Sequence, residues 1–188
     1  MDQPLILASA SPRRRELVGY MGIPFEVICA DAEELKEGAP EELVQENALR
    51  KAQAVAVQHP GRLVLGADTL VAQSGRVMGK PRSEEEAKDM IRCLSGKWHE
   101  VYTGVCLMQD DRKDVRFDVS RVQFVPLSPE TIAAYVKTGE PMDKAGAYAI
   151  QGKAGMFISR MEGSYSNVIG LPLSLVRDML MDAGIENL

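Results

Sequence analysis

The chain has 188 residues, of which 45% are hydrophobic and only 5% aromatic, a composition that predicts one compact domain with an aliphatic core. A formal net charge of −5 gives no overall positive field, which argues against long nucleic acid as a partner. The three cysteines form no CxxC pair, which argues against a disulfide framework and a zinc site. No apolar run approaches the roughly 20 residues of a membrane span, and Asp2 is unlike the basic start of a signal peptide. We therefore expect a soluble cytoplasmic protein with no membrane contact.

Strand and helix patterns alternate in the first half of the chain. Short apolar runs predict strands, and proline next to a capping or acidic residue, followed by an apolar stripe, predicts helices. The expected elements are a strand at 5–8, a helix from Pro12 to about Met21, a strand at 25–28, an acidic loop at 31–37, a helix from Pro40 toward His59, and a strand at 63–66. We expect Asp68 and Thr69 at or just past the end of this last strand, before residues 70–72 continue in an extended conformation.

The second half adds a hairpin to this pattern. Ser83 and Glu86 form a capping box, and alternating apolar residues on either side of a polar turn predict two antiparallel strands. The expected elements are a helix from Ser83 to Gly96, strands around 101–105 and 115–119 joined by a turn at 109–112, a helix from Pro129 to Gly139, a loop at 140–148, a strand at 156–158, and a helix from about Pro172 to Gly184. Crossover strands together with a hairpin predict a mixed-sheet α/β domain.

Three arginines crowd the start of the first predicted helix. A helix N-terminus already carries about half a positive elementary charge, so cations there cost roughly a few tenths of a kcal/mol each. A polyphosphate would compensate, because free backbone N–H groups, the Ser11 hydroxyl and the guanidinium groups of Arg13 and Arg14 all suit it. The alternative is a solvated surface patch paired with carboxylates such as Glu16. Neither GxGxxG nor GxxxxGK[ST] occurs, so the segment is not one of the glycine-rich phosphate loops.

Asp68 is the second candidate for chemistry. A carboxylate at a strand end can hold Mg²⁺ or accept a proton from an attacking water, and Glu33 and Glu34 offer further carboxylates. A metal that joins a polyphosphate to a protein uses only one or two carboxylates. The alternative is that Asp68 only caps a turn.

Other polar residues are less specific on their own. Lys51 reads as a solvated helix lysine, whereas Lys80 lies in a constrained Gly-Lys-Pro turn. Gln151 could read the edge of a base through its paired donor and acceptor, or could be a surface amide. His59 and His99 have no ligand spacing around them, and we expect both to be structural.

Seven blocks of sequence, taken together, resemble the Maf family of nucleotide pyrophosphatases over essentially the whole chain. They are SASPRRREL at 9–17, GADT at 66–69, GKP at 79–81, LSG at 94–96, TGV at 103–105, DKAGAYAIQG at 143–152 and GLPL at 170–173. The resemblance implies a single domain over residues 1–188 with the inosine-triphosphate-pyrophosphatase-like fold, two lobes around a cleft, dependence on Mg²⁺ or Mn²⁺, and a homodimer.

The resemblance also implies a role for each candidate residue. Asp68 corresponds to the proton acceptor, and Asp68 and Glu34 correspond to metal contacts. The residues that correspond to substrate contacts are Ser11, Arg13, Arg14, Lys51, Thr69, Lys80 and Gln151.

Within the family, the combination of Arg13, Thr69 and Gln151 is similar to the branch that hydrolyses dTTP and UTP to the monophosphate and pyrophosphate. This implies removal of non-standard pyrimidine triphosphates, with a possible link to cell division. Two alternatives stay open: a 7-methyl-GTP pyrophosphatase, and a nucleotide-binding regulator of septum formation that does not depend on hydrolysis. Ala149 stands where the family usually has glycine.

Overall fold

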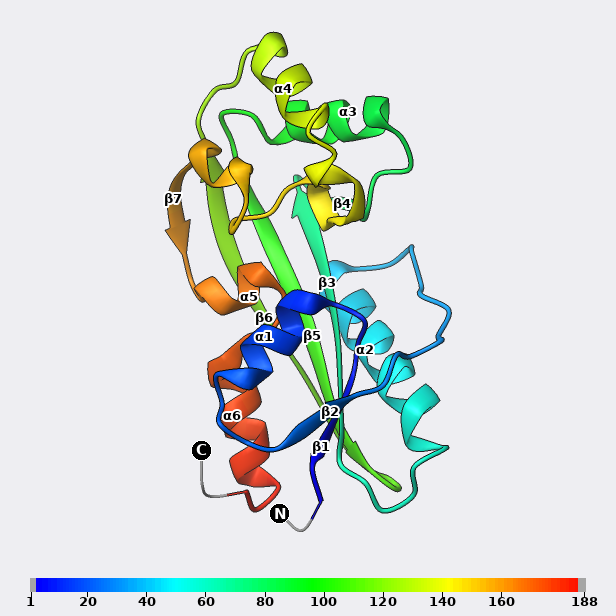
Figure 1. Ribbon diagram of the computed structural model, residues 1–188. Coiled ribbons are helices and arrows are strands. Elements are labelled where there is room, and N and C mark those ends of the chain that lie inside the picture. Colours follow the sequence, from blue (N-terminus) through cyan, green and yellow to red (C-terminus); the bar gives the residue numbers. More distant parts are fainter. Residues whose placement is uncertain (1–2, 186–188) are drawn as a thin grey trace. The chain divides into compact units, whose positions relative to one another are not determined.

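The computed structural model describes residues 3–185 and has an α/β architecture with a seven-stranded sheet in this part of the chain (Figure 1). The strands are β1 (Leu5–Ala8), β2 (Phe25–Val27), β3 (Val64–Gln73), β4 (Arg76–Met78), β5 (Trp98–Gln109), β6 (Arg112–Phe124) and β7 (Ile158–Glu162). The α-helices are α1 (Pro12–Gly19), α2 (Pro40–Ala56), α3 (Glu84–Leu94), α4 (Pro129–Val136), α5 (Tyr165–Ile169) and α6 (Leu173–Asp182), and the 3₁₀ helices are η1 (Glu140–Asp143), η2 (Ala145–Ala147) and η3 (Lys153–Phe157). None of the helices within these residues is long and apolar enough to cross a membrane.

The sheet is mixed, as the sequence predicted. Its strand order is β2-β1-β3-β5-β6-β7, with β4 paired to β3 beside this path. β1 runs parallel to both β2 and β3, whereas β4 pairs antiparallel with β3 and β7 pairs antiparallel with β6. The parallel strands are separated in sequence by α1 and α2, because a parallel connection needs a crossover.

The described chain folds into two compact units, and each unit is assembled from segments that are distant in sequence. The first unit contains residues 3–69, 103–118 and 170–185, and the second contains residues 70–102 and 119–169. The long strands β3, β5 and β6 contribute residues to both units.

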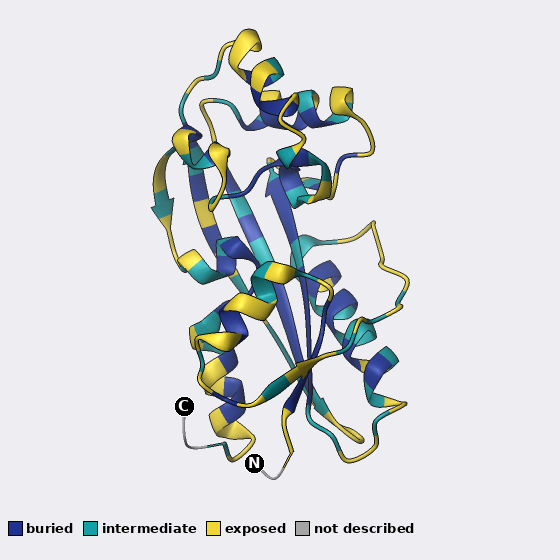
Figure 2. Cartoon of the chain, viewed as in Figure 1, coloured by how far each residue is buried: buried dark blue, intermediate teal, exposed yellow. Residues whose placement is uncertain are grey.

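In the first unit, α2 lies directly against β3 and β5. A Cβ atom added at Gly66 would lie 2.4 Å from the carbonyl oxygen of Ala48, and one added at Gly104 would lie 2.1 Å from that of Val44. Only glycine permits this approach. Ile6, Ala8, Ala48, Ala52, Val55, Val64 and Cys106 form the buried cluster there, and β1 is buried along its whole length (Figure 2). The contact fixes α2 side chains next to β3.

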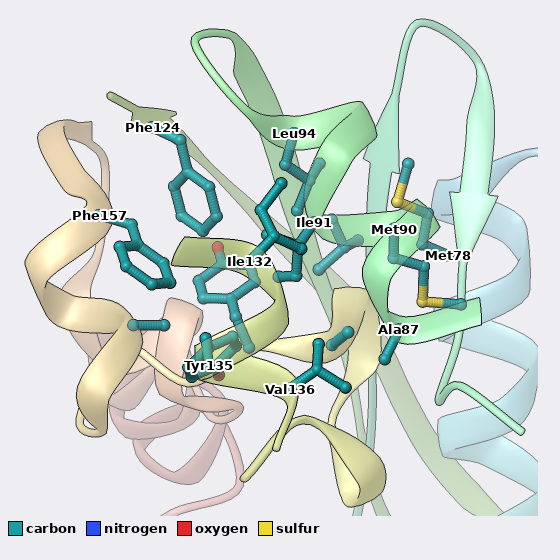
Figure 3. Close-up of a cluster of buried hydrophobic side chains, with 14 of the residues drawn as sticks. Met78, Ala87, Met90, Ile91, Leu94, Phe124, Ile132, Tyr135, Val136 and Phe157 are labelled. Atoms are coloured by element: carbon teal, nitrogen blue, oxygen red, sulfur yellow. The ribbon is translucent and has the colours of Figure 1, made fainter. Parts of the chain in front are cut away.

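The second unit has its own apolar core, drawn in Figure 3. α3 contributes Ala87, Met90, Ile91 and Leu94, α4 contributes Ile132, Tyr135 and Val136, and Met78, Phe124 and Phe157 complete the labelled set. The apolar stripes that predicted these two helices therefore face one core.

His99 is fully buried in the second unit, in agreement with its predicted structural role. Its ring meets those of Phe124 and Tyr148 edge to face, and its Nε2 lies 2.7 Å from the Tyr148 hydroxyl. Its Nδ1 has no hydrogen-bond partner within the described residues. Burial lowers the pKa of His99 to about 4 and raises the pKa of Tyr148.

The predicted position of Asp68 in its strand was wrong. The strand does not end near Gly66 but continues to Gln73, so Asp68 lies inside β3. The parallel partner β1 does stop there, since its last pair is Ala8 with Gly66, but β4 takes over as a partner from Val71 onward. The apolar run that stops at Gly66 therefore coincides with the end of the neighbouring strand β1, and not with the end of β3.

Three expectations for the second unit also change. The predicted loop at 140–148 contains the 3₁₀ helices η1 and η2. The predicted strand at 156–158 is displaced, because Met156 and Phe157 belong to η3 and β7 starts where Ile158 pairs with Phe124. α5 was not predicted, since a five-residue helix is too short for a periodic apolar stripe. The hairpin of β5 and β6 and the cap of α3 at Ser83 are confirmed.

Candidate active site

Two neighbouring residues of β3 direct their side chains to opposite faces of the strand. Successive residues of a strand alternate between faces, and Asp68 contacts α2 while Thr69 contacts α1 and the residue that begins the GLPL segment, Gly170. Asp68 is only 8% exposed. The site in the first unit therefore has an α2 face and an α1 face.

On the α2 face, Lys51 pairs with two carboxylates at once. Its Nζ lies 2.6 Å from Asp68 Oδ1 and 2.6 Å from Glu34 Oε1. The Lys51 side chain is 15% exposed, so its interpretation as a solvated helix lysine is wrong. The lysine sits at this place because α2 packs so closely on Gly66 and Gly104.

Asn47 completes this face, and sequence reasoning missed it. It is 3% exposed, and its Nδ2 donates to Asp68 Oδ2 at 3.1 Å. The same amide pairs with the backbone of the acidic loop, because Nδ2 donates to the Leu35 carbonyl at 3.0 Å and Oδ1 accepts from the Leu35 N–H at 2.7 Å. The available signal was a polar residue four positions before Lys51, which places both on one helix face.

On the α1 face, Arg14 joins three parts of the first unit. Its Nε donates to the Gly170 carbonyl at 2.8 Å, its Nη2 to Thr69 Oγ1 at 2.9 Å, and its Nη1 to Ser9 Oγ at 3.5 Å. Burial lowers the pKa of Arg14, while the charges of Asp68 and Glu34 oppose that shift. Thr69 Oγ1 also lies 3.0 Å from Thr103 Oγ1.

The start of α1 is capped as the sequence predicted. Ser11 is the N-cap, and its Oγ accepts from the Arg14 N–H at 3.4 Å. Arg13 differs from Arg14, because its half-buried side chain makes no hydrogen bond or ion pair with residues 3–185. The donors of the Arg13 side chain therefore remain available to a ligand.

Lys80 and Gln151 belong to the second unit, and both are exposed. Their segments meet there, because the Gly146 N–H donates to the Gly79 carbonyl at 3.1 Å. Ala149 has no positive φ, so its methyl group fits the backbone at the position where the resemblance leads us to expect glycine. The remaining candidates, Ser11, Arg13, Arg14, Glu34, Lys51, Asp68 and Thr69, all lie in the first unit.

The donor set on the α2 face suits a hard divalent cation. No group of three or more His, Cys, Asp or Glu side chains that could hold a metal occurs within the described chain. Asp68 and Glu34, however, place two carboxylate oxygens around one ammonium nitrogen. Mg²⁺ typically takes one or two carboxylates and completes its shell with water and substrate phosphates, so the residues present fit such an ion.

Comparison with known proteins decides the family. A family model described as "Maf-like protein" matches residues 4–183. The chain belongs to the Maf family. Among Maf relatives, a protein named dTTP/UTP pyrophosphatase from Symbiobacterium thermophilum is 51% identical over 97% of this chain and 95% of its own. One of the same name from Bacillus cereus is 47% identical over 93% of each chain. A solved structure, protein VC0702 from Vibrio cholerae, shares 14% identity over 72% of this chain and 67% of its own, with a TM-score of 0.37.

Proposed function

We propose that this Maf protein is a nucleoside triphosphate pyrophosphatase that hydrolyses dTTP and UTP to the monophosphate and pyrophosphate. The observation that carries the proposal is a nearly buried Asp68 held by Lys51 and Asn47, in the same unit as an arginine-rich helix start. The names of the relatives from Symbiobacterium thermophilum and Bacillus cereus support the reaction and the substrates.

In the proposed reaction, Asp68 accepts a proton from a water that attacks the α-phosphorus. A new P–O bond forms there, the bond from the α-phosphorus to the bridging oxygen breaks, and pyrophosphate leaves with that electron pair. An ionised carboxylate has about four lone-pair sites, so Asp68 can receive the proton while Asn47 stays bound to it. A carboxylate held in position to take a proton from the attacking water accelerates the reaction by general base catalysis.

The cationic residues would neutralise the triphosphate. Arg13 has unused donors, the Ser11 hydroxyl keeps its own proton to donate while it caps α1, and Lys51 and Lys80 add positive charge. A divalent ion held by Asp68 and Glu34 would supply further neutralisation of the phosphate oxygens when bound.

Arg14, Thr69 and Gln151 would act on the substrate in different ways. Arg14 has two N–H bonds left after its three contacts, and these would donate to a phosphate oxygen. Thr69 and Gln151 would select the pyrimidine base, and the donor and acceptor pair of Gln151 suits a base edge.

We infer a cellular setting from the same reaction. The protein would act in the cytoplasm, as one domain and as a homodimer, and would remove non-standard pyrimidine triphosphates before polymerases use them. It would need Mg²⁺ or Mn²⁺ as a cofactor.

The test is pyrophosphate release by the purified protein with Mg²⁺. The panel contains dTTP, UTP, 5-methyl-UTP, 7-methyl-GTP, ITP and the common triphosphates. Release mainly from dTTP and UTP is expected. Release mainly from 7-methyl-GTP would keep the reaction but reject the roles of Thr69 and Gln151, and no release from any nucleotide would reject the enzyme and favour a binding regulator.

A further inference from the structure

Asn47 is a nearly buried polar side chain on the inner face of α2. It is 3% exposed, and its neighbours on that face are the fully buried Val44 and Ala48. A buried amide needs partners, because an unsatisfied polar group costs about 1–3 kcal/mol. Asn47 finds all of them in two places: the backbone of Leu35 and the carboxylate of Asp68.

These contacts link the two carboxylates that Lys51 bridges. Leu35 follows Glu34 directly in the acidic loop (residues 31–37), and its N–H and carbonyl both bind the Asn47 amide, at 2.7 and 3.0 Å. The same amide holds Asp68 Oδ2 at 3.1 Å. Asn47 therefore ties the backbone beside Glu34 to the side chain of Asp68.

We propose that Asn47 is a positioning residue that holds the acidic loop against β3, so that Glu34 and Asp68 together form the divalent-cation site. The inference rests on the proposed function, since it gives Asp68 and Glu34 their role in the reaction. Lys51 occupies the space between both carboxylates in the free protein, and Asn47 keeps the carboxylates in place when that ammonium group exchanges for a metal ion.

The amide is suited to this task for a chemical reason. It donates and accepts at the same time, so it can satisfy a backbone N–H, a backbone carbonyl and a carboxylate. A carboxylate at this position could not donate to Asp68 and would repel it. An aliphatic side chain would leave the Leu35 backbone and one Asp68 oxygen without these partners.

Asn47→Leu tests the proposal, because leucine keeps the volume and removes every hydrogen bond. Mn²⁺ binding is measured by the electron paramagnetic resonance signal of free Mn²⁺, with the metal alone and with added pyrophosphate. We expect the dissociation constant to rise about tenfold to hundredfold, the range for losing a residue that orients metal ligands. Exchange of the Leu35 amide hydrogen should accelerate, and kcat for dTTP should fall with it. Asn47→Ala provides the same test if the leucine variant does not fold.

Two variants serve as controls. Leu35→Ala keeps both backbone contacts to Asn47 and should bind Mn²⁺ like the unmodified protein. Asn167→Ala removes another fully buried amide, which donates to the Val101 carbonyl and Ser120 Oγ in the second unit. It should lower the melting temperature without changing Mn²⁺ affinity.

The outcomes separate this inference from the proposed function. A folded Asn47→Leu protein with unchanged Mn²⁺ affinity and unchanged kcat would overturn the role of Asn47 while the enzyme stands. Absence of Mn²⁺ binding by the unmodified protein under both conditions would also overturn it. Absence of nucleotide hydrolysis would remove the proposed function, and the Mn²⁺ titration would still decide whether Asn47 couples the carboxylates.

Discussion

The two faces of β3 carry polar groups of different kinds. On the α2 face, Lys51 lies 2.6 Å from both Asp68 and Glu34, so opposite charges meet directly. On the α1 face, Arg14 donates to a hydroxyl and a carbonyl, those of Thr69 and Gly170, and no carboxylate lies within hydrogen-bond distance of it among the described residues. One face holds ions that a charged ligand can rearrange, and the other holds a cation tied to neutral groups.

Because of this difference, two adjacent arginines of the SASPRRREL segment have different roles. Arg13 and Arg14 are adjacent, but only Arg14 joins α1 to β3 and Gly170. Because Arg14 connects α1, β3 and the segment at Gly170, the α1 face contributes rigidity. We expect the ion pairs of the α2 face to rearrange when a phosphate group and a metal ion bind.

Asp68→Asn should give the largest effect, and it probes the α2 face. Asparagine keeps the shape but cannot accept the proton, so kcat for dTTP should fall about 10²- to 10⁴-fold. Lys51 keeps Glu34 as a partner, so the melting temperature should change by only a few degrees. A folded variant with full activity would remove Asp68 from the reaction.

Gly104→Ala should weaken the α2 face as a whole. The added methyl carbon would lie 2.1 Å from the Val44 carbonyl oxygen, so α2 must move away from β5. Overpacking of this kind costs about 1–3 kcal/mol of unfolding free energy, which urea denaturation measures. Gly79→Ala is the matched control, because a Cβ atom there meets no atom within 4 Å. Equal stability of both variants would contradict the close packing of α2.

The two arginines should separate activity from stability. Arg13→Ala should lower kcat/KM for dTTP about ten- to hundredfold, as expected for losing charge-assisted bonds to phosphate, without changing the melting temperature. Arg14→Ala should also destabilise the fold by about 2 kcal/mol, because it leaves three acceptors without their donor. Equal loss of stability in both would erase the contrast between them.

His99 contrasts with the ion-paired residues of the α2 face, because it is buried without a charged partner. Its folded pKa of about 4 lies below the ordinary 6.5, so the unfolded chain binds the proton more readily between these values. Stability should therefore decrease as the pH falls from 6.5 to 4 and level off below, with a loss of about 2 kcal/mol between pH 7 and pH 5. His99→Phe should lose this part of the pH dependence in thermal denaturation. If the stability of His99→Phe kept the same pH dependence as that of the unmodified protein, His99 would be a solvated residue that does not cause it.

Much of the fold could be predicted from local signals. Ser11, Ser83 and Ser128 each precede a helix and accept the expected backbone hydrogen bond, because capping depends on neighbours in sequence. The mixed sheet could be predicted because the sequence pattern indicated one hairpin and two crossover connections. The end of β3 could not be predicted, because its extension depends on pairing with β4.

The site was only partly predictable. The charge pattern at the start of α1 pointed to Arg13 and Arg14, but it could not show that Arg14 binds Gly170, a residue 156 positions away. Asn47 was missed for the same reason, since its partners come from a loop and from β3. From the sequence, Lys51 gained a role only through the family resemblance.

The central claim is that Asp68 directs water to the α-phosphorus, and hydrolysis of dTTP in ¹⁸O-labelled water tests it most directly. The label would be located by mass spectrometry in the two products, with Asp68→Asn run in parallel. We predict that dTMP carries the label, that pyrophosphate does not, and that the variant forms neither product at a comparable rate. Label in pyrophosphate would place the attack at the β-phosphorus and contradict the mechanism.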